Sequence, residues 1–89
     1  MSAQRKEKKM WSMLDRFFLR VLGEKAGKEV MAESRDQAAA FLAASPETSP
    51  SRRETMRTTI LPRTAVYTGL KRRGLDAGKL MGKYLREVQ

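Results

Sequence analysis

Apolar residues in the first quarter of the chain recur at alternating steps of three and one. They are Met10, Met13, Leu14, Phe17, Phe18, Val21 and Leu22. This spacing places them on one side of an α-helix, opposite a side that carries mainly charged residues. Trp11 lies beside this apolar stripe rather than in its centre, and Gly23 is a natural point for the helix to end. The pattern therefore predicts an amphipathic helix over residues 4–22.

A second helix, with a thinner apolar face, is predicted over residues 25–44. The residues that can share this face are Val30, Met31, Ala38, Phe41 and Leu42. Ser34 interrupts the face, and several of the remaining positions are alanine. Alanine favours helix strongly but buries little apolar surface. We therefore expect this helix to pack at close range against its neighbours.

Residues 45–51 read Ser-Pro-Glu-Thr-Ser-Pro-Ser. Prolines and serines at this density are typical of a linker rather than of regular structure. The segment is expected to divide the chain into one helical pair over residues 1–44 and another over residues 52–89.

The third predicted helix covers residues 52–73 and contains Pro62. Because proline lacks an N–H and disfavours helix at the preceding residue, two arrangements are open. One helix continues with a kink, or residues 52–58 form a short turn and the main helix begins near Thr59. The residues of the expected apolar face are Ile60, Leu61, Ala65, Val66, Tyr67 and Leu70.

The junction before the fourth helix carries specific local signals. Gly74 lies where a helix would end in left-handed geometry, and Leu75 would then contact Leu70. Asp76 is a good N-cap for a helix over residues 77–88, with Leu75 in the staple position. The apolar face of this helix comprises Leu80, Met81, Tyr84, Leu85 and Val88, and the glycines that would permit a close helix crossing are Gly78 and Gly82. The four segments predict a single all-α domain of about four helices in two pairs.

The composition excludes most catalytic chemistry. The 89 residues contain no cysteine and no histidine, so thiolate chemistry, disulfides and the commonest metal ligand are all absent. The acidic residues do not group as a carboxylate pair, and Tyr67 and Tyr84 fit a core role with a polar tip. We therefore expect no catalytic residue, no metal site and no cofactor.

Charge points to the class of partner. The chain contains nineteen Lys and Arg residues and ten Asp and Glu residues, which gives a formal net charge of +9. Such an excess suits a polyanion, an anionic membrane surface or an acidic protein partner. The candidate anion-binding residues are Arg52, Arg53, Arg57, Lys71, Arg72 and Arg73. Alternatively, the cations at 71–73 simply oppose the dipole at a helix C-terminus.

The stripe on the first helix is the candidate protein-binding surface. Its candidate residues are Met10, Trp11, Leu14, Phe17, Phe18 and Val21. The same stripe could instead pack into the core of the domain, or place residues 5–22 on a membrane surface. No apolar run is long enough for a membrane span or for the core of a secretory signal, which favours a cytoplasmic protein.

Residues 60–75 resemble part of a known enzyme family. They read Ile-Leu-Pro-Arg-Thr-Ala-Val-Tyr-Thr-Gly-Leu-Lys-Arg-Arg-Gly-Leu, a helix that ends in a glycine turn, and an amphipathic helix with a tyrosine follows. With the Gly-Lys-Glu-Val sequence at 27–30, this pattern is similar to the N-terminal helical part of the L-2-amino-thiazoline-4-carboxylic acid hydrolase family. The resemblance covers residues 20–89.

The resemblance implies a scaffold role. Family chains are longer, and their cysteine-containing catalytic region lies in a C-terminal half that has no counterpart in these 89 residues. The implied function is a non-catalytic helical subunit, or N-terminal segment, that packs against a protein partner or against itself. The alternatives are a small basic module that binds nucleic acid and peripheral membrane binding through residues 5–22.

Overall fold

The computed structural model describes residues 3–46 and 49–88, which form helices and short connections without any strand. The elements are α1 (Ala3–Leu22), α2 (Glu24–Ala44), α3 (Pro50–Thr55), the π-helical turn η1 (Met56–Ile60), α4 (Leu61–Arg72) and α5 (Ala77–Val88). Because α3, η1 and α4 follow one another without interruption, they form one long helix. The prediction of an all-α fold of four helices is confirmed.

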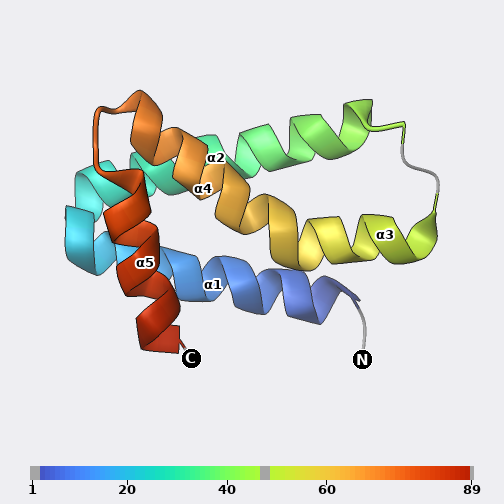
Figure 1. The fold of residues 1–89 in the computed structure, drawn as a ribbon, viewed down its shortest axis with the longest axis horizontal. Helices are drawn as coiled ribbons and strands as arrows, with labels where there is room; N and C mark the ends of the chain where they lie inside the picture. Colours follow the sequence, from blue (N-terminus) through green and yellow to red (C-terminus); the bar gives the residue numbers. More distant parts are fainter. Residues whose placement is uncertain (1–2, 47–48, 89) are drawn as a thin grey trace.

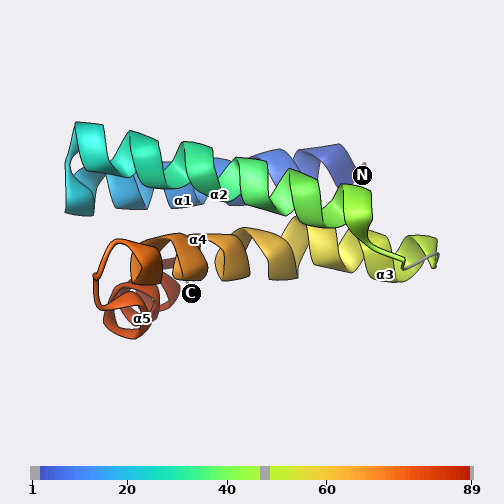
Figure 2. The same cartoon turned by 90° about the horizontal axis from the view of Figure 1, so that it is seen from above.

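The helices lie in two layers. α1 and α2 run antiparallel in one layer, and the long α3–η1–α4 helix lies across them together with α5 (Figures 1 and 2). Buried apolar side chains from α1, α2, α4 and α5 belong to one cluster. The two predicted pairs therefore share a single core.

The predicted linker at 45–51 extends too far toward the C-terminus, because residues 50 and 51 are helical. Pro50 is the first residue of α3, so the helix begins inside the predicted linker. Proline has its φ angle already set for a helix and needs no N–H in the first turn, which explains why a helix begins there. Ser45, Pro46 and Ser49 are non-helical, while positions 47 and 48 of the linker lie outside the described residues.

Pro62 is accommodated by a wide helical turn. The N–H of Leu61 bonds to the carbonyl of Met56, five residues earlier, and Pro62 then occupies the first turn of α4. A single inserted turn of this kind absorbs the hydrogen bond that proline cannot make. The long helix changes direction between α3 and α4 (Figure 1), so the continuous helix is the correct one of the two predicted arrangements.

The α4–α5 junction has the predicted backbone geometry. Gly74 has a φ of 74°, its N–H bonds to the Lys71 carbonyl at 3.0 Å, and the Leu75 N–H bonds to the Leu70 carbonyl at 3.1 Å. The Asp76 carboxylate accepts a hydrogen bond from the Lys79 N–H at 3.1 Å, as an N-cap does. Leu75 is 37% exposed, although the sequence predicted that it contacts Leu70 and takes the staple position of the next helix. Backbone hydrogen bonds, rather than apolar burial, hold this turn.

Two close helix contacts involve Gly27 and Gly69, for which the sequence pattern predicted no packing role. A methyl group at Gly27 would lie 2.8 Å from the Phe18 carbonyl oxygen, so α1 and α2 meet there backbone to backbone. At Gly69 it would lie 3.3 Å from the Ser34 hydroxyl, where α2 meets α4. Gly82 has open space around it, which corrects the predicted crossing at Gly78 and Gly82.

Ser34 lies in the contact between α2 and α4. Its side chain is fully buried, and its hydroxyl lies 2.7 Å from the Val30 carbonyl and 3.4 Å from the Ala65 carbonyl. The serine that interrupts the apolar face in the sequence is therefore a satisfied polar residue inside the helix contact. The expectation that α2 packs at close range is confirmed.

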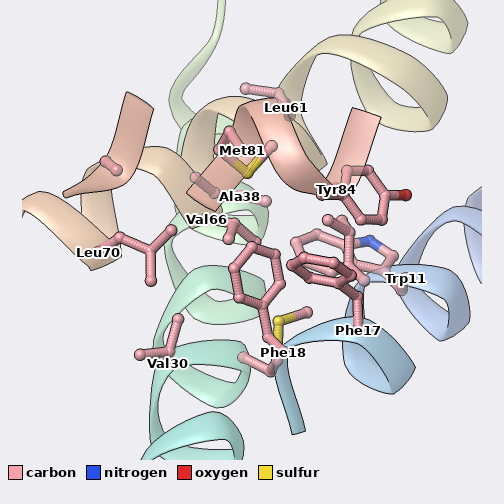
Figure 3. Close-up of a cluster of buried hydrophobic side chains, with 14 residues drawn as sticks. Trp11, Phe17, Phe18, Val30, Ala38, Leu61, Val66, Leu70, Met81 and Tyr84 are labelled. Atoms are coloured by element: carbon pink, nitrogen blue, oxygen red, sulfur yellow. The ribbon is translucent and has the colours of Figure 1, made fainter. Parts of the chain in front are cut away.

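Aromatic rings from α1 and α5 form the centre of the core (Figure 3). The Tyr84 ring lies 5.5 Å from the Phe17 ring and 6.2 Å from the Phe18 ring, measured between centroids. Trp11 is only 9% exposed and belongs to the same cluster, which corrects its predicted place beside the stripe. Phe41 is 51% exposed, although the sequence placed it on the buried face of α2.

Tyr84 should make the domain sensitive to alkali. Burial raises the pKa of the Tyr84 phenol above its ordinary value of 10.0, and the charge of Arg63 opposes the rise. The unfolded chain therefore releases this proton first, so stability is fully present below the ordinary pKa and is lost as pH rises through the folded-state pKa. We expect the melting temperature of Tyr84→Phe to fall less than that of the parent between about pH 9 and 11.

The matched control is Tyr67→Phe, because the Tyr67 ring is 40% exposed. Thermal circular dichroism across the pH series compares the three proteins. A parallel loss of melting temperature in all three would contradict the assignment of the alkaline transition to Tyr84.

Candidate partner-binding surfaces

Most side chains of the predicted protein-binding stripe on α1 are buried in the core of the domain. Leu14 and Phe18 are fully buried, Phe17 is 5% exposed and Trp11 is 9% exposed. Val21 is 40% exposed, and Met10 is partly buried against the core. Of the three roles that the sequence left open, the structure places these four side chains in the core, where little of their surface remains for a partner. The same four side chains are not available for membrane-surface binding by residues 5–22.

The predicted anion-binding cations at the end of α4 face acidic residues of α2. The Arg73 guanidinium lies 3.1 Å from the Glu29 carboxylate and 3.9 Å from that of Glu33. Arg72 lies 3.6 Å from Glu33, and the Lys71 ammonium stands 5.7 Å from the centre of the Tyr67 ring. These contacts connect two helices of the chain, and they weaken the case for an anion site here.

The other predicted cations lie at the opposite end of the long helix. The Arg53 guanidinium donates a hydrogen bond to the Leu42 carbonyl at 2.8 Å, and Arg57 lies 3.8 Å from the Glu7 carboxylate. Arg52 is exposed on α3. Because α3 and the end of α4 are far apart (Figure 1), the structure does not bring the two predicted groups into one site.

Two further ion pairs join α1 to its neighbours. Arg35 of α2 forms a two-pronged pair with Asp15 and stands 5.3 Å from the centre of the Trp11 ring. Arg20 pairs with Glu87 of α5. Since these groups are substantially exposed, each pair contributes little to stability, but together they engage acidic side chains along α1 and α5.

The described ranges 3–46 and 49–88 contain few groupings of residues that could bind a metal ion or span a membrane. No group of three or more Asp or Glu residues there is placed to hold a metal ion. No helix in the same ranges is long and apolar enough to cross a membrane. The carboxylates of Glu29, Glu33 and Glu87 each face an arginine of a neighbouring helix or its end.

Two large apolar side chains are exposed on the outward side of the η1–α4 segment. Ile60 is 49% exposed and Tyr67 is 40% exposed, and Thr64 lies between them on the same side of the helix. A shallow hollow toward α5 is lined by Arg63, Thr64, Tyr67, Met81 and Leu85. A second hollow, toward α2, is lined by Gln37, Ala38, Phe41, Leu61, Thr64, Ala65 and Thr68. Thr64 borders both hollows, and we call the two hollows together with Ile60 the α4 outer surface.

Sequence reasoning assigned Phe41, Ile60 and Tyr67 of this surface to the core. The sequence does contain a pattern that could have predicted their exposure. The apolar positions of this helix extend around more of its circumference than one buried face needs, and they are 60, 61, 65, 66, 67 and 70. A helix that is apolar on more than one side has either two partners in the fold or one partner outside it.

Comparisons with protein-family models, curated proteins and solved structures found no match to this chain. The hydrolase-family resemblance therefore stays a hypothesis that depends on the sequence pattern of residues 27–30 and 60–75.

A second surface runs along α1. One hollow between α1 and η1 is lined by Lys6, Lys9, Met10, Met13, Thr58 and Thr59. Another, between α1 and the end of α5, is lined by Met13, Arg16, Phe17, Arg20, Glu87 and Val88. Met13 borders both hollows, which follow one another along α1, and we call the two together the α1 groove.

Proposed function

We propose that this chain is a non-catalytic helical domain that binds a partner protein by helix packing on the α4 outer surface. The observation that carries the proposal is the exposure of Ile60 and Tyr67 at positions where a solvent-facing helix would carry polar residues. Exposed apolar patches with polar rims mark interaction sites, and tyrosine is common among the residues that dominate binding energy.

The shape of the surface favours a helix as the occupant. Thr64 is a small residue between two large ones, and a hollow lies on each side of it. A ridge of side chains from a second helix can enter such a depression. Arg63 and Lys71 lie near this apolar surface, so acidic residues at the margin of the partner helix would complement it.

The proposal agrees with the resemblance to the N-terminal helical part of the hydrolase family. In that case the covering helix belongs to a cysteine-containing catalytic part, supplied by a longer polypeptide or by a separate subunit. This chain contributes no catalytic residue to that assembly and acts as its helical scaffold.

The test uses the product of the adjacent open reading frame as the probe, where it encodes a cysteine-containing protein. Sedimentation velocity of the mixture should show a complex, and Ile60→Ser combined with Tyr67→Ser should weaken it by about tenfold or more. Val21→Ser is the matched control, because Val21 is equally exposed but lies on α1. An unchanged complex in the double variant would refute the role of this surface.

The nucleic-acid alternative has one observation in its favour, which is the exposed cation row Lys79, Lys83 and Arg86 on α5. We expect this row to support only weak, salt-dependent binding to a random duplex, about 10⁻⁴–10⁻⁶ M at physiological salt. Nanomolar, sequence-dependent binding in a fluorescence titration would replace the partner-protein proposal with this one.

A further inference from the structure

The α1 groove follows one side of a single helix. Its α1 residues recur at helical spacing and are Lys6, Lys9, Met10, Met13, Arg16, Phe17 and Arg20. From the first to the last of them the helix rises about 21 Å, which is about four turns. Thr59 of η1 borders one end of the groove and Val88 of α5 borders the other. The groove is thus elongated and matches the length of a short helix.

The rim of the groove is strongly cationic. Within the described part of the chain, Lys6, Lys9 and Arg16 form no ion pair, and the Arg20 guanidinium pairs with Glu87. Glu7, the nearest acidic residue in the sequence to Lys6 and Lys9, faces Arg57 across the α1–η1 contact. Four cations therefore surround the groove with one acidic residue among its lining side chains.

The floor of the groove is apolar and adaptable. Met10 and Met13 are half-buried, and Val88 is 36% exposed at the α5 end. The Tyr84 hydroxyl donates a hydrogen bond to the Met10 sulfur at 3.6 Å, which ties this part of the floor to the core. Methionine side chains are flexible and polarisable, so surfaces lined with them fit apolar side chains of varied shape.

We propose that the α1 groove binds an acidic amphipathic helix of a protein partner. Apolar side chains of that helix, spaced three and four residues apart, would cover Met10, Met13 and Val88. Its carboxylates would lie beside Lys6, Lys9 and Arg16, which lack acidic partners in the described structure. About 14 residues of partner helix are enough to cover the groove.

A helix of this kind fits the groove better than a nucleic acid does. Single-stranded nucleic acids need aromatic faces on which bases stack. Among the described residues that line the groove, the aromatic one is Phe17, which is 5% exposed. A phosphate backbone also has no apolar side chains that could cover the methionines in the floor of the groove. Charge complementarity and the apolar floor together therefore favour a protein helix.

The groove is separate from the α4 outer surface, and the two proposals can fail independently. The groove is built by α1, η1 and the end of α5, whereas the outer surface is built by α2, α4 and an earlier part of α5, with Ile60 at the end of η1. The variant Ile60→Ser with Tyr67→Ser should consequently bind a groove ligand as the parent does.

The probe for the test is a fluorescein-labelled helical peptide of about 14 residues, with leucines on one side and glutamates on the other. Fluorescence anisotropy measures its binding to the full chain at about 0.15 M salt. The groove variant is Lys9→Ala with Arg16→Ala, and the control is Lys79→Ala with Lys83→Ala, which removes the same charge from α5. A third variant, Met13→Gln, changes the floor, and circular dichroism verifies that every variant is folded.

We expect the groove variant to bind at least about tenfold more weakly than the control variant. Met13→Gln and a peptide with the same composition but no apolar side should each also lose affinity. Equal weakening by both double variants, or equal binding of the rearranged peptide, would show attraction by net charge alone and overturn the proposal. No binding at about 1 mM peptide, or groove-dependent binding of a single-stranded oligonucleotide that displaces the peptide, would overturn it as well.

Discussion

Phe18→Ala should unfold the domain or bring it close to unfolding. The Phe18 ring is fully buried and lies 4.9 Å from the Phe17 ring and 6.2 Å from the Tyr84 ring, measured between centroids. Removing such a ring from a core costs about 3–5 kcal/mol, because apolar burial is lost and a cavity remains. The total stability of a domain of 89 residues is about 4–13 kcal/mol. The change therefore removes a large fraction of the free energy of unfolding.

The matched control is Phe41→Ala, the same substitution at a ring that is 51% exposed. We expect it to cost about 1 kcal/mol or less, since most of that ring is already in water. Urea denaturation followed by circular dichroism measures both variants. Similar losses for the two variants would contradict the division of the phenylalanines into one core residue and one surface residue.

Gly27→Ala should destabilise the domain even though alanine is the better helix former. The added methyl group would lie 2.8 Å from the Phe18 carbonyl oxygen and 2.9 Å from the Leu19 α-carbon, both of them backbone atoms. Forcing the α1 and α2 backbones apart costs about 1–3 kcal/mol, and this outweighs the gain of up to about 1 kcal/mol in helix propensity. We expect a net loss of about 1–2 kcal/mol in urea denaturation.

Gly82→Ala is the control with the opposite sign. No atom of a neighbouring element lies within 4 Å of the position of the new methyl group, and the residue is inside α5. The variant should therefore gain up to about 1 kcal/mol from helix propensity alone. A gain at both glycines would show that α1 and α2 are farther apart at Gly27 than the structure has them, and a loss at both would show that α5 is more tightly packed.

The two proposed binding surfaces, the α4 outer surface and the α1 groove, have different lining residues. The first is apolar around Ile60 and Tyr67, and the second combines a methionine floor with unpaired cations such as Lys9 and Arg16. A partner with one apolar helix and one acidic helix could engage both. Such a two-site partner would bind more tightly than either surface alone allows, provided that its linker spans them.

The sequence was sufficient for the first helix and for the α4–α5 turn, which depend on local backbone preference. The steps of three and one predicted α1, and Gly74 with Asp76 predicted the turn that joins α4 to α5, with hydrogen bonds as observed. These features involve hydrogen bonds between residues close together in the chain. They are therefore visible in the order of residues, whatever the rest of the fold does.

The tertiary structure alone decided which apolar residues are buried and which cations are paired. Trp11 is in the core and Phe41 is not, although the helical pattern suggested the reverse. A helix with a broad apolar side can be rotated about its axis so that different residues of that side face the core. Which residues are buried depends on the helices that cross it. The close contact at Gly27 and the ion pair between Arg73 and Glu29 likewise join residues far apart in the chain, so only the packing of the helices could determine them.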